Sequence, residues 1–253
     1  MVTEIPRLVV AGLSGDSGKT IVTSCLLTAL EQAGLSVAVF KKGPDYIDAA
    51  WLSVISRTAC RNLDTYLADP DKSLKTFTSN AGAADIAVIE GNRGLFDGKD
   101  VHGTHSTAEL ARLLQAPVAL VIDATKATRT VAALVKGCQV FDPNIQIAGV
   151  ILNRIAGRRH LRIVTETIEK YCNVPVLGAL PKLGDDASLI PGRHLGLVTP
   201  SEFESEDRLR SRLQEMAEKH LDIDRLISVA RTAAPMEVPR KSEPKRPGDV
   251  RIG

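Results

Sequence analysis

The chain has 253 residues, of which 44% are hydrophobic and 4% aromatic, so it can build one large α/β domain with an aliphatic core. Its formal net charge of +2 argues against a basic surface for nucleic acid. No apolar run approaches the roughly 20 residues of a membrane span, and the N-terminal residues do not resemble a secretory signal.

Four cysteines, Cys25, Cys60, Cys138 and Cys172, lie far apart and follow no metal-ligand spacing. Widely separated cysteines of this kind are typical of reduced thiols in an intracellular protein. We therefore expect a cytoplasmic protein that associates with neither nucleic acid nor a membrane.

Short β-branched runs alternate along the chain with segments of helical character. Strands are expected at 8–11, 37–40, 86–89, 118–122, 147–152 and 176–180, and helices at 19–33, 106–115, 128–141, 159–171 and 202–219. The strands lack strict polar alternation, which is typical of strands covered on both faces. Gly34 is expected to cap the first helix, and Ser106 with Glu109 resembles a capping box. This alternation predicts an α/β fold with a doubly wound, mostly parallel sheet.

The end of the chain has a different composition. From Ala234 onward it contains four prolines and several charges, which predicts a linker. We therefore expect one folded domain over residues 1–232 and a linker over residues 233–253. The final Val250–Gly253 is similar to the start of another strand, so a further domain is expected beyond it.

The stretch GLSGDSGKT at Gly12–Thr20 follows the first expected strand and opens the first expected helix, which is the context of a phosphate-binding loop. Gly15 and Gly18 would let backbone N–H groups turn toward an anion, and the helix start adds partial positive charge. Lys19 would reach the β- and γ-phosphates, and Thr20 would bind Mg²⁺. Nucleotide contacts are expected from Gly15, Asp16, Ser17, Gly18, Lys19, Thr20 and Ile21.

The glycine pattern of this loop narrows its class. The common spacing G-x-x-x-x-G-K-[ST] would place its first glycine at Leu13, whereas this chain has Gly12 and an additional Gly15. The variant resembles a branch that contains partition-type ATPases, which carry an early lysine, and metabolic ligases such as dethiobiotin synthetase, which lack it. Ser14 occupies that position, so the resemblance favours a ligase. A partition-type regulatory ATPase is the alternative from another class.

A second polar loop, FKKGPDYID, follows the second expected strand at Phe40–Asp48. Gly-Pro forces a turn and places Asp45 and Asp48 at the carboxyl edge of the sheet, where open α/β sheets bind ligands. Carboxylates beside phosphate need a cation between them, and Mg²⁺ is the ordinary choice. Lys41 and Lys42 can offset phosphate or substrate charge. A solvated surface loop is the alternative interpretation.

A third loop, EGNRGLFDG, follows the expected strand at 86–89. Glu90 stands directly after that strand, which is the usual place for a second metal-binding acid in phosphate-loop proteins. The glycines would let the backbone approach a ligand closely. For Asp97 and Gly98, a plain turn is an equal alternative.

Together these motifs resemble the synthetase domain of the cobyrinate a,c-diamide synthase family over about residues 7–230. The resemblance also rests on RNLD at Arg61–Asp64, STAELARLL from Ser106, GVILNR at Gly149–Arg154, VLGALPK at Val176–Lys182 and RHLGLV at Arg193–Val198. GPDYID and GLFDG favour this family over dethiobiotin synthetase, and the second loop favours it over cobyric acid synthase.

The resemblance implies a P-loop NTPase-like fold, similar to dethiobiotin synthetase, and an ATP-dependent carbon–nitrogen ligase that uses ATP and Mg²⁺. In this family a carboxylate of a corrin precursor, cobyrinic or hydrogenobyrinic acid, attacks the γ-phosphate of ATP. Ammonia then converts the acyl phosphate to an amide at the a- and c-acetate side chains. The ammonia comes from glutamine in a C-terminal amidotransferase domain. We expect such a domain or subunit as a partner, and a homodimer.

The resemblance also assigns roles to single residues. It implies catalysis by Lys19, Lys41, Asp45, Asp48 and Glu90, and Mg²⁺ binding by Thr20, Asp45, Asp48 and Glu90. Asn153 is expected to bind the adenine edge and Pro181 to lie near the base. Substrate contacts are expected from Lys42, Tyr46, Gly94, Leu95, Asp97, Ser106 and Thr107. For Ser106, simple helix capping is an equal alternative.

The chain departs from the family at two points. After GPDYID it has Ala49-Ala50-Trp51 in place of a proline and a nearby histidine, so a sirohydrochlorin-type ring is an alternative substrate. Trp51 lines a macrocycle pocket or fills the core. No cysteine has the setting of a glutaminase nucleophile, so we expect a fragment, a separate glutaminase or free ammonia. His102 and His105 are expected at the surface, without zinc.

Overall fold

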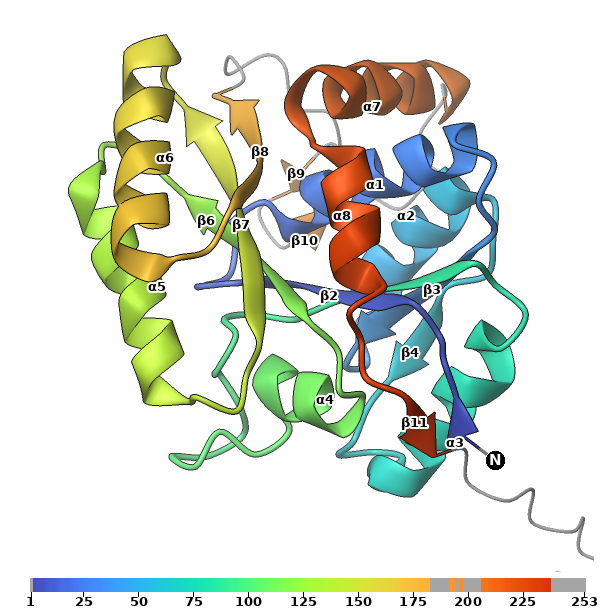
Figure 1. Cartoon of the computed structure of the whole chain (residues 1–253). Helices are drawn as coiled ribbons and strands as arrows, with labels where there is room; N and C mark the ends of the chain where they lie inside the picture. Colours follow the sequence, from blue (N-terminus) through green and yellow to red (C-terminus); the bar gives the residue numbers. More distant parts are fainter. Residues whose placement is uncertain (1, 183–191, 194–195, 198–205, 238–253) are drawn as a thin grey trace, which may run out of the picture.

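The computed structural model describes residues 2–182, 192–193, 196–197 and 206–237. Its centre is a seven-stranded parallel sheet in the order β4-β3-β5-β2-β6-β7-β8 (Figure 1). The strands are β2 (Arg7–Gly12), β3 (Val37–Lys42), β4 (Arg61–Leu63), β5 (Ile86–Glu90), β6 (Val118–Asp123), β7 (Ile147–Ile155) and β8 (Val176–Pro181). Two short antiparallel pairs join β1 (Val2–Thr3) to β11 (Met236–Glu237) and β9 (Gly192–Arg193) to β10 (Gly196–Leu197). Each expected strand is confirmed.

Helices cover both faces of the sheet (Figure 1). One face carries α1 (Lys19–Gln32), α2 (Tyr46–Ser56), α7 (Glu206–His220) and α8 (Ile223–Ala230), and the other carries α3 (Asp69–Ala81), α4 (Thr107–Leu113), α5 (Arg129–Phe141) and α6 (Arg158–Cys172). Because successive side chains of a strand point to opposite faces, Leu8 and Val10 of β2 pack in the core on the face of α1, whereas Val9 packs in the core on the face of α5. The doubly wound arrangement is therefore confirmed.

The structure contains elements that the sequence pattern missed. Helix α2 begins because Asp45 caps it: Oδ1 accepts hydrogen bonds from the backbone N–H groups of Ile47 and Asp48, each at 3.0 Å. Trp51 of this helix is fully buried in the core, which confirms the core interpretation of that residue. Strand β4 has only three residues and is a strand because it pairs with β3. Helices α3 and α8 were also not expected.

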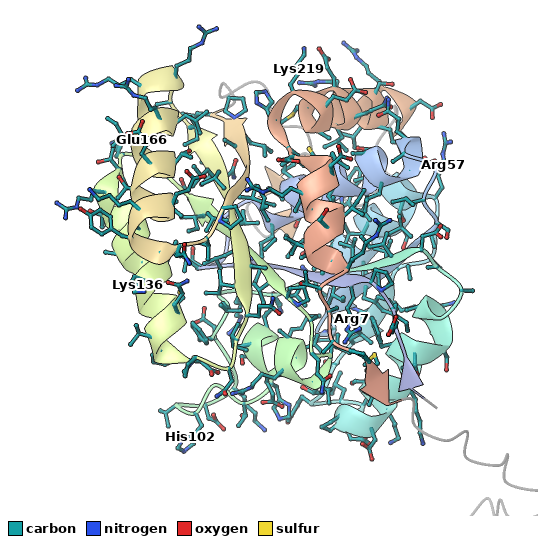
Figure 2. All side chains as sticks on the ribbon, viewed as in Figure 1. Arg7, Arg57, His102, Lys136, Glu166 and Lys219 are labelled. Atoms are coloured by element: carbon teal, nitrogen blue, oxygen red, sulfur yellow. The ribbon has the colours of Figure 1, made fainter. Side chains whose placement is uncertain are left out.

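The folded part reaches Glu237, a few residues beyond the expected start of the linker at residue 233. Met236 is buried, and β11 pairs with β1. The fully buried Arg7 donates hydrogen bonds to the backbone carbonyls of Ala234, Ile5 and Leu114, and it lies inside the ribbon in Figure 2. Residues 202–205 of the last expected helix and residues 238–253 lie outside the described residues. Among the described helices, none has both the length and the apolar character that a membrane span requires.

Candidate functional site

The phosphate-loop motif connects β2, which ends at Gly12, to α1, which begins at Lys19. Two glycines are required sterically, because a Cβ at Gly12 would lie 2.2 Å from Ser17 Oγ, and one at Gly18 would lie 2.0 Å from Asn153 Nδ2. Gly18 also has a φ of +92°, in the left-handed region that favours glycine. Gly15 differs from expectation: it is not among the positive-φ residues, and a Cβ there would meet no atom within 4 Å.

Lys19 joins the phosphate loop to the loop after β5. Its Nζ donates hydrogen bonds to the carbonyls of Ser14 at 3.0 Å and Arg93 at 2.8 Å. The side chain is largely buried, and burial lowers the pKa of Lys19. The negative charge of Glu90 acts against this shift. The Arg93 carbonyl is a contact that the motif analysis missed, although its position in EGNRG, three residues after Glu90, could have indicated it.

Lys41 lies at the centre of a buried charged cluster, which we define as Thr20, Lys41, Asp48 and Glu90. The parallel register places Lys41 of β3 beside Glu90 of β5, and Lys41 Nζ lies 2.7 Å from Glu90 Oε1 and 2.5 Å from Asp48 Oδ2. The Thr20 hydroxyl, on the first turn of α1, donates to the same Glu90 oxygen at 3.0 Å. Residues from three separate motifs therefore meet at the carboxyl edge of the sheet.

Burial and charge act in opposite directions on this cluster. Burial by itself would lower the pKa of Lys41, but the Glu90 and Asp48 carboxylates hold that pKa above its usual range. Burial raises the pKa of the Asp48 carboxyl, while Lys41 opposes this shift and Glu90 adds to it. Removing several charges from water is costly even when they pair. Such a cluster at a strand edge indicates a functional site more than a structural brace.

The cluster offers oxygen atoms that suit Mg²⁺. Glu90 Oε2 and Ser17 Oγ are buried atoms without a hydrogen-bond partner among the described residues. Carboxylate and hydroxyl oxygens are suitable ligands for Mg²⁺, which usually also keeps water and phosphate oxygens. Within the described part of the chain, no three His, Cys, Asp or Glu side chains form a metal site by themselves. Asp45 contributes its Oδ1 to the cap of α2.

The loop after β5 holds several residues that were expected to touch the substrate, and most of them have structural partners. Asp97 Oδ2 accepts a hydrogen bond from the Gly94 N–H at 2.9 Å, which matches the turn interpretation. Leu95 is buried in the core, so its side chain does not line a substrate surface. Ser106 Oγ caps α4 by accepting from Glu109 N–H at 3.2 Å, and Thr107 Oγ1 bonds to the Asn92 backbone. The capping alternative for Ser106 therefore accounts for its side chain.

Lys42 and Tyr46 lie in the second polar loop on either side of a fixed turn. Lys42 points to the opposite sheet face from Lys41. Burial there lowers the pKa of Lys42; the charge of Asp64 opposes this shift, and that of Arg93 adds to it. The Tyr46 side chain is 72% exposed. Asn62 holds the turn because its Nδ2 donates to the carbonyls of Gly43 at 2.7 Å and Asp45 at 3.0 Å. The sequence analysis did not single out Asn62, although it lies in the RNLD motif.

Asn153, expected to bind adenine, braces the phosphate loop in this structure. Its Nδ2 donates to the Ser17 carbonyl at 3.0 Å, and its Oδ1 accepts from the Arg154 N–H at 2.9 Å. Pro181 ends β8 opposite Ile155, at the same edge of the sheet. Ile21, the third residue of α1, is partly buried against the core.

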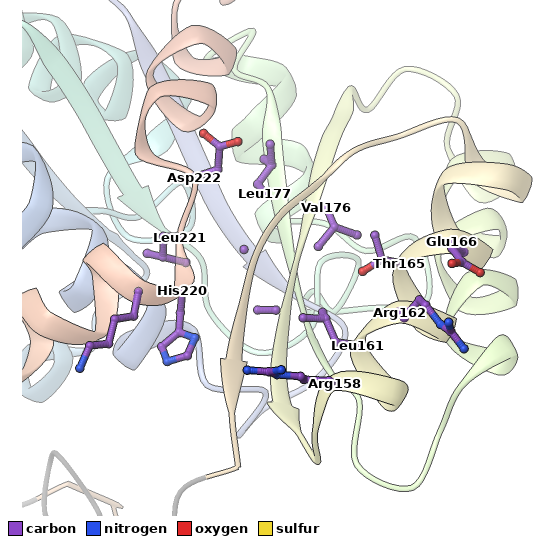
Figure 3. A pocket seen from close by; sticks show the side chains of 13 residues that line it. Arg158, Leu161, Arg162, Thr165, Glu166, Val176, Leu177, His220, Leu221 and Asp222 are labelled. Carbon is purple, nitrogen blue, oxygen red and sulfur yellow. The ribbon is translucent and has the colours of Figure 1, made fainter.

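Several cavities of the described residues are lined by none of the four residues of the buried charged cluster. The first, of about 620 Å³, lies beside the edge strand β8, between α6 and the segment that joins α7 to α8 (Figure 3). The second, of about 490 Å³, is lined by Arg93 and by residues 96–98 and 100–103 of the loop after β5, among others. His102 lies in that loop, at the outer margin of the molecule in Figure 2. The second cavity adjoins the loop after β5, which follows Glu90. A third, of about 520 Å³, is lined by residues of α1, of β3 and of the segment after α2.

Residues 8–195 match the model of the CobQ/CobB/MinD/ParA nucleotide-binding domain, called CbiA. The chain belongs to the CbiA family. Cobyrinate a,c-diamide synthases of Magnetococcus marinus, Dehalococcoides mccartyi and Archaeoglobus fulgidus are 44%, 43% and 40% identical to it, over 93%, 91% and 92% of this chain. The resemblance based on the motifs is thereby confirmed. The chain spans about half the length of these curated relatives: the matched part is 50%, 50% and 51% of their respective lengths.

A solved structure supports the fold of this CbiA-family domain. Chloroplast FtsY from Physcomitrella patens superposes with a TM-score of 0.51 over 83% of this chain and 66% of that chain, at 15% sequence identity. At this identity the similarity concerns the fold alone. Together with the parallel sheet and the family match, it confirms the expected P-loop NTPase-like fold.

Proposed function

We propose that this chain is the ATP-dependent synthetase part of a cobyrinate a,c-diamide synthase, a carbon–nitrogen ligase. The observation that carries the proposal is the buried contact of Lys41 with Glu90 and Asp48 beside the phosphate loop. This contact joins the GPDYID and EGNRG motifs to Thr20. The identity of 44% to a protein named as such a synthase supports the same conclusion.

The proposed reaction has two steps. An oxygen of the substrate's a- or c-acetate carboxylate forms a bond to the γ-phosphorus of ATP, the bond from that phosphorus to the β–γ bridging oxygen breaks, and ADP leaves with the electron pair. Ammonia then attacks the acyl carbon and loses a proton, and phosphate leaves. Such a reaction depends mainly on positioning and charge neutralisation.

The residues of the cluster suit this chemistry. Mg²⁺, held by Thr20 and Glu90 with Asp48 or Asp45, would neutralise charge on the phosphate oxygens. Lys19 would contact the β- and γ-phosphates from the loop, and Lys41 would neutralise the transferring phosphoryl group. Whichever of Asp45 and Asp48 does not bind the metal would orient the substrate carboxylate or ammonia.

The ammonia supply is proposed to lie outside this chain. Cys25, Cys138 and Cys172 are buried thiols, and Cys60 is only partly exposed. None has the exposed turn that a glutaminase nucleophile requires. We propose that a glutamine amidotransferase domain or subunit provides ammonia. The expected homodimer and cytoplasmic location remain predictions.

Incubation of the chain with ATP, Mg²⁺, ammonium and either cobyrinic or hydrogenobyrinic acid tests the proposal. Mass spectrometry should detect ATP-dependent conversion of the ring to a diamide, and omission of ammonium should prevent it. Amidation of sirohydrochlorin in preference to both corrin precursors would move the substrate to the alternative ring. ATP hydrolysis that is unaffected by any tetrapyrrole would contradict a ligase and favour a regulatory ATPase.

A further inference from the structure

An exposed cluster of rings and one cation lies outside the charged cluster. The rings of Tyr66 and His105 have centroids 5.4 Å apart at an interplanar angle of 67°. Lys99 Nζ lies 4.1 Å from the centroid of the Tyr66 ring. Thr65 Oγ1 also lies 2.9 Å from His105 Nδ1. These contacts join the loop after β4 to the loop between β5 and α4.

This ring cluster lies at the same edge of the sheet as the proposed reaction centre. Tyr66 follows β4, whose last residue, Leu63, pairs with Lys42 of β3. The carboxyl ends of parallel strands meet at one edge of a sheet, where ligands bind. Asp64 directly follows Leu63, and Glu109 lies in the first turn of α4.

The backbone of the ring cluster is held by the same two acids. Asp64 Oδ1 accepts a hydrogen bond from the Tyr66 N–H at 2.8 Å, and Glu109 Oε2 accepts one from the His105 N–H at 2.7 Å. Each of these bonds holds the backbone of its own loop, and the Thr65–His105 contact joins the two loops. Such fixed side chains bind a ligand at little cost in ordering.

The loops that carry the ring cluster expose apolar and cationic side chains, together with Asp97 and Asp100, whose carboxylates accept hydrogen bonds within their own loop. Tyr66 is 57% exposed, and Leu67, the next residue in the chain, and Val101, two residues after Lys99, are exposed as well. Lys99 and Arg93 are exposed cations, and no carboxylate of the described residues lies within ion-pair distance of either. Exposed apolar groups beside unpaired cations suit a ligand that is both flat and anionic.

We propose that Tyr66, Lys99 and His105 form a second subsite for the tetrapyrrole, which contacts the ring and a carboxylate that is not being amidated. This inference rests on the proposed function. A tetrapyrrole with several carboxylates can place only one of them beside Lys41 and Glu90 at a time, so the others need separate cationic partners. Because two acetate arms react in turn, a contact remote from the reacting arm helps to decide which arm reaches the reaction centre.

Two variants test the subsite in the chain supplied with ATP, Mg²⁺, ammonium and cobyrinic acid. Tyr66→Leu removes the ring, and Lys99→Ala removes the cation. Each should raise KM for cobyrinic acid by about 10-fold, as expected for the loss of one contact to the ring or of one hydrogen bond to a substrate carboxylate, while KM for ATP changes by less than about 2-fold. The ratio of mono- to diamide in the product should also change, because the ring is held less firmly in one orientation. Tyr66→Phe should restore the wild-type KM.

A second exposed tyrosine with a nearby lysine serves as a matched control, because it lies near the amino end of β8, away from the carboxyl edge of the sheet. Tyr171, near the C-terminal end of α6, is 47% exposed and has Lys170 Nζ 5.6 Å from its ring centroid. Tyr171→Leu and Lys170→Ala should leave both KM values unchanged. If Tyr66→Leu lowers the melting temperature, the KM of the Lys99→Ala variant is the test of the subsite, because the Lys99 side chain is exposed. An active wild type with an unchanged cobyrinic acid KM in Lys99→Ala contradicts the subsite, whereas a wild type that forms no amide contradicts the proposed function itself.

Discussion

Two ion pairs at the carboxyl edge of one sheet have very different surroundings. In the half formed by β2, β3 and β5, the side chains of Lys41 and Glu90 are 2% and 0% exposed. In the half formed by β6 and β7, the side chains of Arg154 and Asp123 form an ion pair but are 42% and 31% exposed. An exposed pair contributes little to stability, and a buried pair is costly to desolvate. Because stability does not explain the buried pair, we interpret it as part of the reaction site. The exposed pair needs no role beyond that of surface charges.

Removing the cation of each pair should give the largest difference. Lys41→Ala leaves the buried Glu90 carboxylate without its partner and should lower the free energy of unfolding by about 3–5 kcal/mol. Arg154→Ala should lower it by less than about 1 kcal/mol. Urea unfolding followed by circular dichroism measures both values. Equal losses in the two variants would contradict the contrast between the two halves of the sheet.

Neutralising the acid of each pair should lower turnover strongly for the buried pair and hardly at all for the exposed pair. Glu90→Gln keeps the shape of the side chain but removes the charge proposed to hold Mg²⁺, so ADP release with tetrapyrrole and ammonium should fall by about 10²–10³-fold. Asp123→Asn serves as the control and should change turnover by less than about 2-fold. Full activity of Glu90→Gln would show that the metal assignment is wrong.

Asn153 connects the two halves of the sheet, because it lies on β7 but its side chain contacts the phosphate loop after β2. If the residue braces Ser17, Asn153→Ala should raise KM for ATP and for GTP alike, by about 10-fold, as expected for the loss of one or two buried hydrogen bonds. If Asn153 instead binds the adenine edge, the variant should lose its preference for ATP over GTP. Steady-state kinetics with both nucleotides distinguish these outcomes.

The smallest expected effect concerns the Cys60 thiol. Burial raises the pKa of Cys60 to about 12, and the charge of Glu90 adds to the shift. Burial also raises the pKa of Cys25 to about 12, but Glu90 is not among its causes. Glu90→Gln should therefore speed alkylation of Cys60 by less than about 10-fold, the effect of one pKa unit. Mass spectrometry of iodoacetamide-labelled peptides should detect no change at Cys25.

Much of the fold could be predicted because its strands are uninterrupted apolar runs. The run Leu8–Ala11 and the motif that follows it were sufficient to predict β2, the phosphate loop and the start of α1. The pattern was insufficient for β4, whose residues Arg61 and Asn62 are exposed and polar. It was also insufficient for α2, because a helix that starts with Asp45 as its cap looks like the continuation of a loop.

The sequence by itself determined the residue types of the site and the order of the loops that carry them. Tertiary structure alone decided how those residues pair. Lys41 and Glu90 are 49 positions apart, and only the parallel register of β3 and β5 brings them into contact. The same packing directed Leu95 to the core and Asn153 to the phosphate loop. Side-chain roles of this kind depend on distances and burial between distant segments, which a linear pattern does not contain.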